Sequence, residues 1–327
     1  MATVIDGTGA PEKQAQNPRG RTRPGPRRPR RNRGNRVAYL LVAPAVIVLL
    51  AVLAYPIGRL IVLSFQSFDS RSLFTGDAPF VGVSNYTEVL SDPEFWTVVG
   101  RTVVVVVAVV AIMMTLGFAL ASLLTRVSPW ARVTLMVCLV LVWAMPMVSA
   151  ALVWQWLFQP QYGVMNWLLT QGRVFGDLSA HDWFSHPEQG MSLIIALIIW
   201  KGLPFVVLTM YAALGQIPGE LYEAAGLDGA GRRQTLRYVT VPMMRPVLAI
   251  LVVLEVIWSV NSFTPIWVLT QGGPSGETST LSVYSYVSAF TANDYGKGAA
   301  ISLITIALLA AFAVLHVRRL AKDGEVA

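Results

Sequence analysis

The sequence predicts an all-α membrane protein whose chain crosses the bilayer six times. Of its 327 residues, 54% are hydrophobic and 13% are charged, whereas soluble domains carry about 25% charged residues. Six apolar stretches approach the roughly 20 residues that a helix needs to span the hydrocarbon layer. They lie at 38–65, 102–124, 133–158, 191–214, 247–269 and 299–317. Pro44, Pro56, Pro146 and Pro204 fall inside these stretches, so we expect a bundle of kinked helices.

Residues 1–36 are a basic segment that precedes the first span. They contain ten of the 25 Lys and Arg residues, together with many Pro and Gly residues. Such a composition cannot bury a core, so we expect a disordered tail. The apolar run that follows is too long for a secretory signal peptide, so we expect the tail to stay in the cytoplasm and to touch anionic lipid. RNA binding is an alternative on charge alone, but we predict no nucleic-acid partner.

Charge in the connecting segments gives the direction of each crossing. With the tail inside, six spans place both termini in the cytoplasm. The inner segments then contain Arg126, Arg132, Arg232, Arg233, Arg237, Arg245, Arg318, Arg319 and Lys322. The outer loops contain Arg71, Arg173 and Lys297, with Arg101 at a boundary. This distribution follows the positive-inside rule and places the segment 215–246 in the cytoplasm. The outer loops 66–100 and 159–190 are rich in aromatic residues, which either anchor to lipid headgroups or dock an external partner.

Catalytic and metal-binding motifs are absent from the sequence. It has no G-x-x-x-x-G-K-[ST] phosphate loop, H-E-x-x-H pair, Cys-x-x-Cys pair or nucleophile elbow. Cys138 is the single cysteine, and the three histidines make no convincing metal set. We therefore predict no catalytic residues, no metal site and no cofactor in this chain. Active transport would draw its energy from an ion gradient or from another subunit.

Two charged residues lie inside predicted spans, namely Lys201 and Glu255. A charge in the membrane interior is costly and indicates a functional site by default. We expect the two side chains either to approach each other or to face a shared water-filled cavity. Ser259, Asn261 and Ser262 follow Glu255 and add groups of the kind that bind sugars. One alternative is a buried ion pair that only fixes helix register, and another is the proton relay of a stand-alone secondary transporter.

The segment 215–246 is polar yet has a helix-like pattern. Pro218 is expected to start a short helix of small residues, with Glu220 in its first turn. Gly229 and Gly231 can end that helix, and Pro242 and Pro246 are expected to mark a bend into the next span. A helix of small residues can lie deep in a groove of another protein. The alternative is an ordinary solvated loop.

This segment resembles the EAA loop of permease subunits in binding-protein-dependent ABC importers. The matching residues are Glu223, Ala224, Ala225, Asp228, Gly229, Val239, Pro242 and Pro246. The stretch at 268–286, with Gly272, Gly273 and Pro274, resembles a segment of first-type sugar permeases of the maltose-permease kind. The stretches at 40–65, 80–96 and 293–302 also resemble that family. The resemblance covers nearly the whole chain after the basic tail.

The resemblance implies a six-span type I ABC importer transmembrane domain over 37–327 in the inner, cytoplasmic membrane of a bacterium. It implies that 215–246 forms a coupling helix seated in a cytoplasmic ATPase, with Glu223 as the charged contact and Gly229 as the close-approach position. It implies a second homologous permease, two ATPase subunits that bind ATP and Mg²⁺, and an extracytoplasmic binding protein that delivers a sugar.

The resemblance also implies a substrate pathway in the spans on either side of the coupling loop. Its positions here are Lys201, Gly202, Phe205, Glu255, Ser259 and Ser262. Lys201 and Glu255 are charged where the maltose relative has uncharged residues, and Ile198 replaces a polar contact. We therefore expect a sugar or oligosaccharide other than maltose. Glycerol phosphate or another polar solute is the alternative.

Overall fold

The computed structural model describes the backbone of residues 33–172 and 176–324, and the side chains of 39–172 and 176–319. The chain divides into two units, Met1–Tyr55 and Pro56–Ala327. The predicted tail at 1–36 falls mostly outside the described residues. Residues 33–36 are described, and the prediction of disorder is wrong there because they form the first turn of helix α1 (Arg33–Ser64). Arg is a good helix former, so the helix continues beyond the apolar run.

The described part of the first unit is the beginning of α1. Its apolar side chains are exposed around the helix; Leu40 and Leu50, for example, are 76% and 59% exposed. Since lipid tails are as apolar as leucine, such a surface suits a membrane span.

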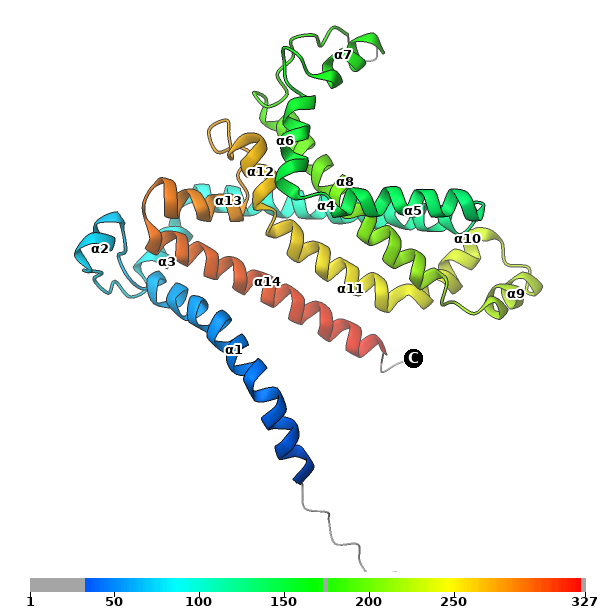
Figure 1. Cartoon of the computed structure of the whole chain (residues 1–327), viewed down its shortest axis with the longest axis horizontal. Coiled ribbons are helices and arrows are strands. Elements are labelled where there is room, and N and C mark those ends of the chain that lie inside the picture. The colour runs from blue at the N-terminus through cyan, green and yellow to red at the C-terminus, as the bar shows by residue number, and fades with distance from the viewer. Residues whose placement is uncertain (1–32, 173–175, 325–327) are drawn as a thin grey trace, which may run out of the picture. The chain divides into compact units, whose positions relative to one another are not determined.

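The second unit is built from helices, and its described residues form isolated β-bridges but no strand. After the end of α1, the elements that precede the first core helix are α2 (Ser70–Thr75) and α3 (Ser84–Ser91). The following elements are α4 (Pro93–Leu124), α5 (Pro129–Ala144), α6 (Met147–Leu157), α7 (Val164–Gln171), α8 (Pro187–Leu214), α9 (Gly219–Leu227), α10 (Arg232–Thr235), the π-helical η1 (Leu236–Thr240), α11 (Val241–Val260), α12 (Phe263–Thr270), α13 (Leu281–Tyr286), the π-helical η2 (Val287–Thr291) and α14 (Tyr295–Gly324) (Figure 1). In this unit α9 and α10 lie at one end of α8 and α11, and α12 and α13 lie at the other (Figure 1).

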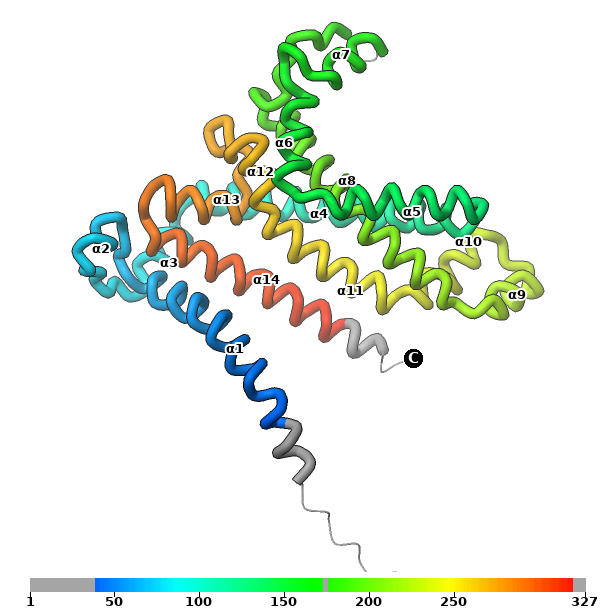
Figure 2. Tube along the Cα trace, viewed as in Figure 1, coloured from blue at the N-terminus to red at the C-terminus, as the bar shows by residue number. Residues whose placement is uncertain are grey.

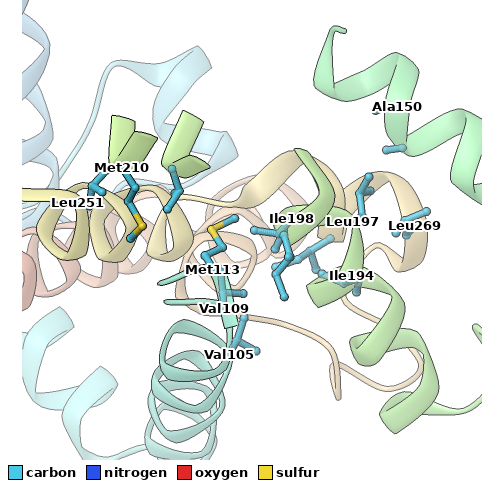
Figure 3. Close-up of a cluster of buried hydrophobic side chains, with 14 of the residues drawn as sticks. Val105, Val109, Met113, Ala150, Ile194, Leu197, Ile198, Met210, Leu251 and Leu269 are labelled. Carbon is cyan, nitrogen blue, oxygen red and sulfur yellow. The ribbon is translucent and has the colours of Figure 1, made fainter. Parts of the chain in front are cut away.

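The core lies where α8 packs along α4, with α11 against both and α6 and α12 at one end. Figure 3 shows the buried side chains that fill it. They are Val105, Val109 and Met113 of α4, Ala150 of α6, Ile194, Leu197, Ile198 and Met210 of α8, Leu251 of α11 and Leu269 of α12. Inside a bilayer, close van der Waals packing rather than water exclusion holds helices together. This packing fixes α8 and α11, which carry both candidate sites.

The kink predicted at Pro146 in the third span, at 133–158, is confirmed, but it is much sharper than a kink within one helix. The structure divides the span into α5 and α6, which are bent by 98° at Met145 and Pro146 (Figure 2). Met145 is extended with ψ of 132°, because the ring of a following proline disfavours the helical conformation. With 16 and 11 residues, the two helices are about 24 and 17 Å long and each is shorter than the hydrocarbon layer. Among the described residues, five helices are long and apolar enough to span a membrane, and six if the bent pair counts as one.

The fifth span differs from the prediction at both ends. Its helix runs through Pro242 and Pro246, so the predicted bend at these prolines is wrong. Pro242 lies in the first turn of α11, where a missing N–H is tolerated, and the wide π-helical turn η1 leads into it. A break at Asn261 and Ser262 then separates α11 from α12. The other long helices begin before the predicted spans, α4 by nine residues and α8 and α14 by four, because their first turns contain polar residues.

Candidate functional site

The first candidate site is a cavity between α8 and α11, near the bend between α5 and α6. Its volume is about 360 Å³. All seven residues predicted for the substrate pathway line this cavity: Lys201, Gly202, Phe205, Glu255, Ser259, Asn261 and Ser262. The shared cavity expected for Lys201 and Glu255 is therefore present in the structure.

Gly202 allows the helices around this cavity to approach closely. A Cβ atom at this position would overlap the Met113 side chain on α4 and would lie 3.9 Å from Glu255 Oε2. Pro204 lies two residues further along α8 and cannot donate a backbone hydrogen bond to the preceding turn. Beside the cavity, α8 is therefore closely packed at Gly202 and lacks one backbone hydrogen bond at Pro204.

Glu255 and Ser259 lie one helical turn apart on α11 and face the cavity. They are only 2% and 3% exposed. Glu255 Oε1 and Ser259 Oγ have no hydrogen-bond partner among the described residues. An unsatisfied buried polar atom destabilises a fold, and it is explained when a ligand or water completes its hydrogen bonds.

Lys201 makes its hydrogen bond to a main-chain oxygen and not to Glu255. Its Nζ donates a hydrogen bond to the main-chain oxygen of Trp143. The described ion pairs both involve Lys297, so the alternative of a direct Lys201–Glu255 pair is wrong. Trp143 precedes the bend between α5 and α6, where the helix ends and its last carbonyls lack helical partners. The ammonium group reaches one of these carbonyls more easily than it reaches the carboxylate across the cavity.

Aromatic faces complete the cavity. The rings of Phe205 and Trp258 meet edge to face with centroids 5.1 Å apart. Asn261 Nδ2 donates to the Ile257 oxygen at 2.8 Å and Ser262 Oγ donates to the Trp258 oxygen at 2.9 Å. These two side chains donate hydrogen bonds to the last carbonyls of α11 and so stabilise the break between α11 and α12. Their acceptor oxygens remain available toward the cavity.

The second candidate site is the exposed segment around α9, which follows the C-terminal end of α8. Helix α9 carries Glu223, Ala224 and Ala225; the first two are exposed and the third is half-buried. Pro218 is the N-cap of α9 rather than its first residue, and Glu220 lies in the first turn as predicted.

The end of α9 is formed by the predicted residues Asp228 and Gly229. Asp228 N donates to the Ala224 oxygen at 3.0 Å, and Ala230 N donates to the Ala225 oxygen at 2.9 Å. Gly229 has φ of 76°, a conformation that glycine adopts without strain. Gly231 instead has φ of −71° and is the N-cap of α10. Pro242 lies beyond η1 and is half-buried in the first turn of α11.

Residues 113–321 match the family model described as "Binding-protein-dependent transport system inner membrane component". The chain belongs to this family. This permease is thus a multi-pass membrane component of a transport system, as the EAA loop and the segment at 268–286 indicate.

Two curated relatives and one solved structure are similar to this permease. The diacetylchitobiose uptake system permease protein DasB of Streptomyces coelicolor is 37% identical over 88% of this chain and 87% of its own length. The trehalose/maltose transport system permease protein MalF of Thermococcus litoralis is 32% identical over 86% of this chain and 93% of its own length. A chain in the crystal structure of a bacterial alginate ABC transporter, in complex with an alginate pentasaccharide-bound periplasmic protein, has a TM-score of 0.73 at 20% identity, over 86% of this permease and 93% of that chain. At this identity the likeness shows the fold alone.

Sequence reasoning missed several residues of both sites. Met113, Trp143 and Met147 line the cavity from α4, α5 and α6, but nothing in their local sequence distinguishes them from ordinary apolar span residues. Leu227 at the end of α9 is 91% exposed and so is accessible to a partner of α9, but single exposed leucines are ordinary on protein surfaces and no sequence signal marked this one.

Proposed function

We propose that this permease moves a sugar or oligosaccharide across the membrane through the cavity between α8 and α11. The observation that supports this proposal is the meeting of unpartnered buried oxygens of Glu255 and Ser259 with the aromatic faces of Phe205 and Trp258. A sugar ring offers hydroxyl groups to the former and its apolar face to the latter. The relatives named for diacetylchitobiose and for trehalose and maltose support the same class of substrate.

The energy for this transport comes from separate subunits. Two ATPase subunits bind ATP and Mg²⁺, and one of them receives α9 in a cleft, with Glu223 as the charged contact. Gly229 and the small residues Ala224 and Ala225 let α9 approach its partner closely. ATP-driven closure would move α9 as a lever and shift the spans between two states with different affinities for the substrate.

The assembly contains a second, homologous permease and an extracytoplasmic binding protein that delivers the sugar. Both termini and α9 face the cytoplasm, as the basic residues of the segments on that side indicate. The outer loops, which include α2, α3 and α7, form the docking surface for the binding protein.

The proposal favours a neutral sugar over glycerol phosphate. The Lys201 ammonium is engaged by the Trp143 oxygen, whereas a Glu255 oxygen remains unpartnered. An anion would meet this carboxyl group without a free cation to offset it. A stand-alone secondary transporter that relays protons through Lys201 and Glu255 is the second alternative, but it gives no role to the exposed α9.

Reconstitution of the complete assembly in proteoliposomes tests this function. The four kinds of subunit are co-expressed from the genes that neighbour this one, and uptake of labelled diacetylchitobiose, trehalose, maltose and glycerol 3-phosphate is measured. We expect uptake of a sugar that requires both ATP and the binding protein. Uptake driven by a proton gradient without ATP would contradict the proposal, and uptake of glycerol 3-phosphate alone would contradict its substrate class.

A further inference from the structure

A second cavity lies at the end of α4, beneath the segment that carries α9. Its volume is about 760 Å³. Three arginines line it: Arg126 from the α4–α5 connection, and Arg232 and Arg233 from α10. The hydroxyl-bearing residues Ser122, Thr125 and Thr235 lie in the same wall. No carboxylate is among the lining residues, so the described walls of this cavity are cationic.

The side chains of these three arginines have no hydrogen-bond or ion-pair partner among the described residues, whereas some neighbouring arginines do have partners. Arg132 donates to the Leu124 and Val127 oxygens at 2.8 and 3.3 Å and lies over the Tyr211 ring. Arg237 lies over the Tyr238 ring. The ion pairs of the described residues belong to Lys297, and the arginine hydrogen bonds belong to Arg101 and Arg132.

Three exposed cations around one cavity create a positive potential that attracts an anion. A guanidinium group presents a planar fork of donors that matches the oxygens of a phosphate, and several such forks bind one phosphate strongly. The Ser122 hydroxyl group can donate to the same oxygens, whereas those of Thr125 and Thr235 already donate to the Ser122 and Gly231 oxygens. A phosphate therefore fits this set better than a carboxylate, which has fewer acceptor oxygens to share among three arginines.

We propose that this cavity binds a phosphate-bearing anion that bridges Arg126 to Arg232 and Arg233. The bound anion would join the α4–α5 connection to α10. Tyr222 and Gly226 of α9 also line the cavity, so its occupant lies directly beneath α9. Binding would therefore restrict the motion of α9 relative to α4.

Two sources can supply this phosphate: the headgroup of an anionic phospholipid or a soluble phosphate compound. The side chain of Trp130, just beyond Arg126, is 79% exposed. Exposed tryptophans mark the headgroup level of a membrane, which places the neighbouring Arg126 near the level of lipid phosphates. A soluble phosphate compound of the cytoplasm is the other source, and the experiment separates the two.

The test uses the full-length permease in its assembled complex. Native mass spectrometry measures how much phosphatidylglycerol is retained after purification from nanodiscs that contain it together with phosphatidylcholine. Isothermal titration calorimetry measures the binding of inorganic pyrophosphate in nanodiscs of phosphatidylcholine alone. The variants are Arg126→Gln and the double substitution Arg232→Gln/Arg233→Gln. Arg245→Gln is the matched control, because Arg245 is also an exposed arginine of this segment but does not line the cavity.

We expect one of the two probes to bind, with an affinity that falls about tenfold for each arginine removed and is unchanged in Arg245→Gln. Retention of phosphatidylglycerol identifies a lipid source, and binding of pyrophosphate identifies a soluble one. Binding of neither probe, or equal loss in the control, would overturn the proposal. All three arginines are exposed, so the variants should fold, and their melting temperatures check this. If the double variant unfolds, Arg126→Gln alone decides between these outcomes.

Discussion

The cavity between α8 and α11 and the segment around α9 are built on opposite physical principles. In the cavity, polar atoms of Glu255 and Ser259 are buried without partners. Around α9 the reverse holds, because the polar and small side chains of Glu223 and Ala224 are exposed. The buried oxygens are unfavourable for the chain alone and are satisfied when a partner binds.

This difference between the two regions indicates which kind of partner each of them binds. A small, partly polar cavity is suited to a small solute, whereas an exposed helix with small residues is suited to a protein surface. The cavity lies at the middle of α8 and at the far end of α11 from α9, so these helices can transmit a displacement of α9 to the cavity. Because the two regions share no residues, a substitution can change one of them without altering the contacts of the other.

The largest effect is expected from Gly202→Val. The added side chain would overlap Met113 and approach Glu255, and overpacking of this kind typically costs about 1–3 kcal/mol of stability. We expect sugar uptake by the reconstituted complex to be abolished and the melting temperature to fall. Gly100→Ala on α4 is the control, because a Cβ atom there meets nothing within 4 Å. Normal uptake by Gly202→Val would show that the cavity does not depend on this close approach.

Glu223→Ala should impair the contact of α9 with the ATPase and leave the cavity unchanged. The side chain is exposed, so its loss should change the stability by no more than about 0.5 kcal/mol. We expect normal expression and ATP hydrolysis that no longer drives uptake, because the charged contact to the ATPase is lost. Both rates are measured in the same proteoliposomes. Glu220→Ala, on the same helix, should retain coupling, and unchanged uptake by Glu223→Ala would contradict the proposed role of α9.

Glu255→Gln should act on the cavity alone. It removes the charge and keeps the shape of a side chain whose Oε1 has no described partner, so the stability should be unchanged or slightly higher. We expect uptake to fall about tenfold, which corresponds to the loss of one hydrogen bond to a charged group. Uptake kinetics and the recovery of the ATPase subunits are measured together. Failure of the complex to assemble would instead favour a structural role in helix register.

Lys201→Met should have the smallest effect on transport and a clear effect on stability. The substitution removes the donor of an exposed hydrogen bond to the Trp143 oxygen, which costs about 0.5–1.5 kcal/mol. We expect a lower melting temperature and a small change in uptake. Lys201→Arg should restore most of the stability because it retains a donor. A stable Lys201→Met protein with no uptake would show that the ammonium group acts on the substrate rather than on the bend.

Much of the fold could be predicted because its signals are local. Long apolar runs identified α1, α4, α8, α11 and α14, and the small residues and Gly229 identified α9. The seven residues predicted for the substrate pathway do share one cavity, although their role in binding stays a prediction. The sharpness of the bend between α5 and α6 could not be predicted, because a proline in a span is compatible with either a mild kink or a sharp turn. Tertiary contacts select the sharp turn, because α12 packs against α6 and the Lys201 ammonium group donates a hydrogen bond to the Trp143 oxygen.

The sequence by itself determined the membrane character of the chain, the number of apolar segments and the position of the α9 segment between two of them. These follow from hydropathy, charge and backbone preference, which act over a few neighbouring residues. Only the tertiary structure decided that Lys201 contacts a backbone oxygen instead of Glu255, and that Arg126 shares a cavity with Arg232 and Arg233. Such contacts join residues far apart in the sequence, and the choice among possible partners depends on how the helices pack.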